Sequence, residues 1–195
     1  MFHLLKKLKL SPSFVLIILL YAVAGNLALL PLILAALLVH ESAHIAVIRL
    51  CGLKILRIEA NVLGFIIYTN AALSSYLKDT LTALSGPAAS ILAAYAASWL
   101  ANRGYFSDHL FAFSGLSLLY GFFNLLPCLP LDGGRAFYAL SHIFLPPDAA
   151  RITAVLFHYA AAAIVISCGI FVLIHTKYNL SLLLIGVWLV TYSLP

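Results

Sequence analysis

One segment combines an apolar run with three ionisable side chains: LALLPLILAALLVHESAHIAVI, residues 27–48. On a helix, His40 and His44 lie about one turn apart on the same face, so both imidazoles can bind one metal ion. Glu41 lies next to them as a proton acceptor for metal-bound water. The flanking residues carry no charge, and ionisable side chains are costly at membrane depth unless they have partners. The segment therefore predicts a membrane-spanning helix that carries two metal ligands and a base.

The composition of the whole chain is that of an integral membrane protein. Apolar residues make up 64% and charged residues 9% of the 195 residues, whereas soluble domains have about 45–50% and 25%. The mean hydropathy is +1.09. We expect a single intramembrane domain over residues 1–195, because all long apolar segments must pack beside one another in the same bilayer.

Length and hydropathy predict an all-α polytopic membrane protein with about six transmembrane helices, each needing about 20 residues to cross the bilayer. The expected spans are Leu10–Ala24, Leu27–Arg49, Asp79–Leu100, His109–Leu126, Arg151–Ile174 and Tyr178–Leu194. The basic start of the chain resembles a secretory signal. No cleavage site leads into a polar mature domain, so we expect an uncleaved first helix.

Residues 54–76, between the second and third spans, differ in composition from the spans themselves. β-Branched and aromatic residues surround Gly64 in a segment too short and too broken for another span. This pattern predicts a re-entrant β-hairpin or loop. Irregular backbone is tolerated at membrane depth only where protein or a water-filled cavity satisfies it, so we expect the segment to line the metal site. A hairpin that lies in the headgroup region is the alternative.

The basic residues predict an orientation and a partner. With a cytoplasmic N-terminus, nine Lys and Arg residues fall inside and two outside: Lys6, Lys7, Lys9, Arg49, Lys54, Arg57, Lys78, Arg135 and Arg151 against Arg103 and Lys177. This bias favours a multi-pass protein of the cell membrane with cytoplasmic N- and C-termini. The charges are dispersed among loops, so the net charge of +5 indicates the lipid bilayer and not nucleic acid as the partner.

A catalytic zinc site needs three protein ligands and one open position, so the chain must supply a third ligand. The best candidate is Asp132, within NLLPCLPLDGG, residues 124–134. The two prolines of this segment are expected to break the fourth helix. Gly133 and Gly134 are expected to allow a sharp backbone that turns the carboxylate back toward the histidines.

Other roles remain open for residues near this segment. Asp132 can instead cap the helix that follows, and Cys128 is an alternative thiolate ligand. The three cysteines have no metal-type spacing, so we interpret them as packing residues or free thiols. His158 lies within the fifth span near its cytoplasmic end, and we interpret it as a neutral hydrogen-bonded residue.

Two motifs together carry a resemblance to a known family. His-Glu-x-x-His in the second span is paired with Asn-x-x-Pro-x-x-Pro-Leu-Asp-Gly at the end of the fourth. With them the chain resembles the site-2 protease family of intramembrane zinc metalloproteases, most of all its sporulation branch. Ser85-Gly86-Pro87 and the Gly64 loop fall where that family has a Gly-Pro motif and a re-entrant loop. The motif interior is Ser42-Ala43 where Leu-Gly is commoner. The CBS domain that usually follows the sixth span in that branch is not present up to Pro195, so regulation by such a domain is not expected.

The resemblance implies both a site and a reaction. One Zn²⁺ per chain would be bound by His40, His44 and Asp132, with Glu41 as the catalytic base and Asn124 holding the substrate or the oxyanion. The reaction would be hydrolysis of a peptide bond in or near a transmembrane segment of a membrane-protein substrate. A regulatory membrane partner or a homo-oligomer is left open. The alternative functions are a membrane zinc transporter or sensor and a catalytically inactive membrane-binding relative.

Overall fold

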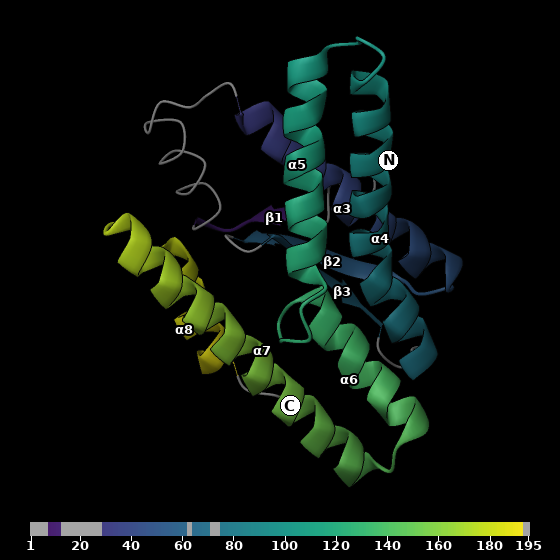
Figure 1. Ribbon diagram of the computed structural model, residues 1–195. Coiled ribbons are helices and arrows are strands. Elements are labelled where there is room, and N and C mark those ends of the chain that lie inside the picture. Colours follow the sequence, from purple (N-terminus) through teal and green to yellow (C-terminus); the bar gives the residue numbers. More distant parts are fainter. Residues whose placement is uncertain (1–7, 13–28, 62–63, 71–74, 193–195) are drawn as a thin grey trace.

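The computed structural model describes residues 8–12, 29–61, 64–70 and 75–192, and these are mostly helical (Figure 1). In chain order the elements are β1 (Leu8–Leu10), α3 (Leu30–Leu50), β2 (Ile55–Asn61), β3 (Gly64–Thr69), α4 (Tyr76–Ala101), α5 (Ser107–Asn124), α6 (Asp132–Phe144), α7 (Pro147–Thr176) and α8 (Ser181–Thr191). A helical membrane-type protein with a hairpin before its third expected span is therefore confirmed.

Three helices in the described part of the chain are long and apolar enough to cross a membrane, namely α3, α4 and α7. Helix α8 is apolar but has only 11 residues. The first expected span, Leu10–Ala24, lies almost wholly outside the described residues, and Leu10 itself belongs to strand β1, which the sequence did not predict. The number of six spans therefore stays a prediction.

Helix α4 packs against α3, α5 and α6 through a face of mostly small residues. The buried residues of this face are Thr80, Thr82, Ala83, Gly86, Pro87, Ser90, Ala94, Ala97 and Ala101. Small side chains allow helix backbones to approach closely in a membrane. The Ser75 hydroxyl caps the helix by accepting a hydrogen bond from the Lys78 amide, so α4 begins at Tyr76, three residues before the expected start of the span.

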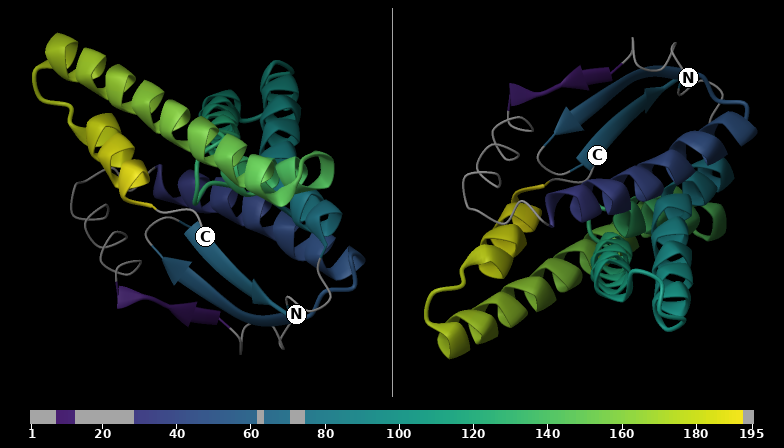
Figure 2. Two further views of the ribbon diagram at one scale, coloured as in Figure 1. Left: turned by 90° about the horizontal axis from the view of Figure 1, so that it is seen from below. Right: turned by 90° about the horizontal axis from the view of Figure 1, so that it is seen from above.

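The hairpin is part of a three-stranded sheet. Strands β2 and β3 pair antiparallel with a bulge near Ile55, and β1 joins β2 in parallel, so β3 is an edge strand. One cluster of buried apolar residues fastens the sheet to the end of α3: Ile48, Leu53, Ile55 and Ile58. Figure 2 shows the sheet on one side of α3 and helices α4, α5 and α7 on the other.

The segment between α5 and α6 brings Asp132 to the start of a helix. Helix α5 ends at Asn124 and α6 begins at Asp132, so the chain is interrupted where the prolines predicted a break. The two glycines allow the tight backbone here through their lack of a side chain and not through a left-handed conformation, since neither has a positive φ. A Cβ at Gly133 would overlap the Leu125 carbonyl, and one at Gly134 would lie 2.5 Å from the Leu129 nitrogen. Both glycines therefore let the first turn of α6 pack directly on the preceding loop.

A second apolar cluster fastens that loop to the C-terminal helix pair. It contains Cys128 of the loop, three residues of α7 and one of α8: Ala161, Ala162, Val165 and Leu189. The loop that precedes Asp132 is therefore held against α7 and α8.

Candidate metal centre

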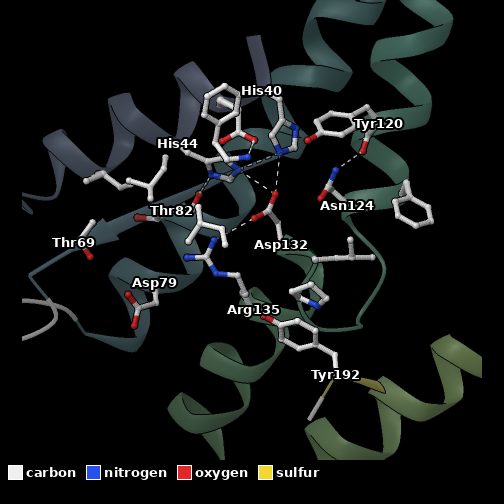
Figure 3. A pocket seen from close by; sticks show the side chains of 18 of the residues that line it. His40, His44, Thr69, Asp79, Thr82, Tyr120, Asn124, Asp132, Arg135 and Tyr192 are labelled. Carbon is white, nitrogen blue, oxygen red and sulfur yellow. Dashed lines mark hydrogen bonds and ion pairs between the residues drawn. The ribbon is translucent and has the colours of Figure 1, made fainter. Parts of the chain in front are cut away.

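The three predicted metal ligands come together in the structure. The Nε2 atom of His40 lies 2.9 Å from Oδ2 of Asp132 and 3.1 Å from Nε2 of His44, which lies 3.1 Å from the same Oδ2. All three side chains are buried, and they point toward one another (Figure 3). They form the one group of metal-ligating side chains found among the described residues.

A single metal ion fits this arrangement. Two imidazole nitrogens and a carboxylate oxygen are donors that zinc accepts at about 2.0–2.2 Å. Three atoms separated by 2.9, 3.1 and 3.1 Å lie on a circle of roughly 1.8 Å radius, which is shorter than those bond lengths. One ion can therefore bind all three atoms and keep a fourth position for water or substrate.

Helix α4 fixes the orientation of both imidazoles. The Nδ1 atom of His40 lies 2.9 Å from the Ser90 hydroxyl, and Nδ1 of His44 donates to the carbonyl oxygen of Thr82 at 2.7 Å. A proton on Nδ1 leaves Nε2 with the lone pair that a metal needs. Sequence reasoning missed both partners. The one signal for Ser90 was a hydroxyl side chain within an apolar span, whereas the backbone carbonyl of Thr82 leaves no signal in the sequence.

Gly86 lies directly against the two histidines. A Cβ at this position would overlap Nε2 of His44 and lie 2.6 Å from Nε2 of His40. Helix α4 continues through Pro87, the next residue. Glycine is therefore required here because any side chain would occupy the space of the ligand atoms.

The second carboxylate oxygen of Asp132 faces Arg135. The Nη1 atom of Arg135 lies 3.4 Å from Oδ1, and its side chain is half exposed. The capping alternative is not observed, since Asp132 follows the N-cap position, Leu131, and its carboxylate contacts the side chains of His40, His44 and Arg135. The positive charge of Arg135 beside Oδ1 favours the ionised carboxylate, which is the form of Asp132 that can bind a metal.

Glu41 and Asn124 line one cavity together with the ligands. The cavity has a volume of about 540 Å³ and is bounded by α3, β3, α4, α5, α6 and α8. The Oε1 atom of Glu41 accepts a hydrogen bond from the Phe65 amide of β3 at 3.3 Å. The side-chain amide of Asn124 donates to the carbonyl oxygen of Tyr120, and the Tyr120 ring packs edge-on against His40 with 4.6 Å between centroids. The contacts of Phe65 and Tyr120 were not anticipated from the sequence.

Cys128 lies outside the ligand group. Its Sγ is 3.3 Å from Nδ1 of His158, and the same Nδ1 accepts the Leu129 amide at 3.1 Å. An accepting Nδ1 carries no proton, which agrees with a neutral, hydrogen-bonded histidine. His158 therefore ties the loop before Asp132 to α7. The three cysteines are free thiols.

Known proteins are similar to this chain in sequence and in fold. No family model matches the sequence. A curated relative, stage IV sporulation protein FB of Bacillus subtilis (strain 168), is 31% identical over 147 residues, which are 73% of this chain and 50% of the relative. The chain thus spans about half the length of that protein. A solved structure, the site-2 protease from Methanocaldococcus jannaschii, is similar with a TM-score of 0.63 and 24% identity over 93% of this chain and 86% of that one.

Proposed function

Because the chain resembles the site-2 protease family in sequence and in fold, we propose that it is an intramembrane zinc metalloprotease. It hydrolyses a peptide bond in or near a transmembrane segment of a membrane-protein substrate. The observation that carries this proposal is the buried triangle of His40, His44 and Asp132, with Glu41 in the same cavity.

Five polar residues of the cavity have a role in this chemistry. His40, His44 and Asp132 would hold one Zn²⁺ ion, which when bound lowers the pKa of water and polarises a carbonyl group. Glu41 accepts the proton of the attacking water and returns it to the leaving amine. The side-chain amide of Asn124 donates a hydrogen bond to the oxygen on which negative charge develops.

Strand β3 is the proposed docking edge for the substrate. A helical transmembrane substrate keeps its carbonyls in its own hydrogen bonds, so it must unwind before attack. Phe65, Ile67 and Thr69 of this edge strand line the cavity beside Glu41. An extended segment can add to such an edge through main-chain hydrogen bonds. The hairpin would then present the unwound substrate to the base.

We place the protein in the cell membrane, with several spans and both termini cytoplasmic. The distribution of basic residues supports this orientation. Large apolar side chains are exposed along the helices, including Leu92 at 69%, Leu119 at 69% and Phe171 at 62%, as lipid contact requires. The α4–α5 turn and the α6–α7 turn lie at opposite ends of the structure (Figure 1), which fits outside and inside positions for Arg103 and Arg151.

Glu41→Gln tests the proposal against its rivals. It should lower cleavage at least ~100-fold, because the base is lost, while the zinc content of the purified protein is retained. In a zinc transporter the substitution would leave zinc flux largely unaffected, and in an inactive relative it would change nothing. The measurement compares membrane-protein fragments and metal content between wild type and variant. The matched control is Glu59→Gln, since Glu59 pairs with Arg57 outside the cavity. Unchanged cleavage in Glu41→Gln would reject the protease.

A further inference from the structure

Strand β3 directs alternate backbone groups to its two sides. The Ser11 amide donates to the carbonyl oxygen of Ala60, so the backbone of Ala60 faces β1. Phe65 is the partner of Ala60 in the antiparallel ladder. Because the backbone groups of Ala60 face β1, Ala60 and Phe65 form a non-hydrogen-bonded pair. The amides of Phe65 and Ile67 consequently point to the outer edge, and those of Ile66 and Tyr68 point to β2.

The outer edge is the one that meets the proposed base. The Phe65 amide donates to Oε1 of Glu41 at 3.3 Å, and Glu41 is 7% exposed. A hydrogen bond to a buried carboxylate fixes the direction in which its oxygens point. Ile67, the next edge residue along the strand, lines the same cavity. The outer edge of β3 therefore contacts Glu41 through the Phe65 amide and directs the next outward amide, that of Ile67, toward the cavity.

We propose that the backbone amide of Phe65 is a positioning group for Glu41 and that Ile67 is the residue with which an extended substrate pairs. This inference rests on the proposed function. The Phe65 amide is engaged with the base, so the substrate strand takes its main-chain hydrogen bonds at Ile67. Phe65 and Ile67 are two residues apart on β3, which is about 7 Å. Since Phe65 contacts Glu41, the bond that is cut lies next to Phe65 and about two residues from the substrate residue paired with Ile67.

Proline substitutions test the two amides separately. An edge strand tolerates proline where its N–H faces away from the sheet. Phe65→Pro is compared with Phe65→Ala, and Ile67→Pro with Ile67→Ala, because alanine keeps the amide. We expect Phe65→Pro to lower kcat about 10-fold at equal KM and zinc content, as loss of a hydrogen bond to a charged group predicts. Ile67→Pro should raise KM about 10-fold at equal kcat. Equal kcat in Phe65→Pro and Phe65→Ala, or equal KM in the Ile67 pair, would overturn the assignment.

A readout without catalysis keeps the test independent of the proposed function. Amide hydrogen exchange, resolved by residue, should be about 10-fold faster at Phe65 in Glu41→Ala than in wild type, while the ladder amide of Ile66 is unchanged. Unchanged exchange at Phe65 would reject the contact whether or not the protein cleaves anything. If wild type and Glu41→Gln give identical fragments, the protease fails, and the exchange result still decides whether Phe65 holds Glu41. Ile66→Pro, which removes a ladder amide, shows the effect of losing the hairpin.

Discussion

The metal centre has two halves that the chain orders in different ways. His40 and His44 lie four residues apart on α3, and one neighbouring helix, α4, supplies partners for both. Asp132 follows His44 by 88 residues and is held through a loop, a helix start and contacts with α7. The histidine half thus depends on helix spacing and one close helix contact, and the aspartate half depends on several separate tertiary contacts.

This difference predicts where the site is most sensitive. On the histidine half, α4 approaches the ligand atoms so closely that no added atom fits at Gly86. On the aspartate half, Arg135, His158 and the glycines of α6 share the task of placing one carboxylate. A single substitution should therefore do most damage beside the histidines, and its effect should fall with distance from the ligand atoms.

Gly86→Ala is expected to have the largest effect. Its Cβ would overlap Nε2 of His44, so both imidazoles must turn away from the metal position. We expect loss of bound zinc and of cleavage, measured as metal content and fragment formation. Gly115→Ala is the control, because a Cβ on Gly115 of α5 has nothing within 4 Å. Zinc binding retained in Gly86→Ala would show that the histidine half tolerates added volume and would contradict its greater sensitivity.

Gly133→Ala tests the aspartate half. Its Cβ would overlap the Leu125 carbonyl, and relief of the overlap must shift the first turn of α6, where Asp132 lies. Overpacking costs about 1–3 kcal/mol, so we expect zinc affinity to fall about 10- to 100-fold while the histidines still bind weakly. A zinc titration measures this, and a thermal melt shows whether the fold survives. An unchanged zinc affinity in Gly133→Ala would contradict the direct packing of α6 on the loop that precedes it.

The same difference decides how much the sequence alone could predict. The spacing of His40 and His44 identified the local half, because helix geometry fixes which side chains share a face. Asp132 was found from its chemistry and from the prolines before it. Ser90 and Gly86 were not assigned contacts with the histidines, because they become neighbours only when α4 packs on α3. Strand β1 was missed for a similar reason, since it pairs in parallel with β2, far away in the sequence.

Ser90→Ala removes the outer partner of His40 without adding volume. The Nδ1 atom of His40 then loses its 2.9 Å contact in a buried position. Loss of such a partner typically weakens metal binding 10- to 100-fold, and we expect about 10-fold here. Ser85→Ala is the matched control, because the Ser85 hydroxyl donates to the Thr82 carbonyl and lies 3.3 Å from His44, which keeps its carbonyl partner. Equal zinc affinity in the two variants would show that Ser90 does not orient His40.

His158→Phe is expected to have the smallest effect, because His158 acts on Asp132 only through the loop. It removes the acceptor of the Leu129 amide and leaves a buried donor unsatisfied, at a cost of about 1–3 kcal/mol in folding stability. Only part of that cost reaches the carboxylate, since Arg135 and the packing of α6 still hold it. We expect a lower melting temperature and a zinc affinity reduced about threefold. His158→Asn, whose side-chain oxygen can accept the same amide, should restore both. If His158→Phe weakens zinc binding as much as Ser90→Ala, the loop places Asp132 as strictly as α4 places the histidines, and the two halves are equally sensitive.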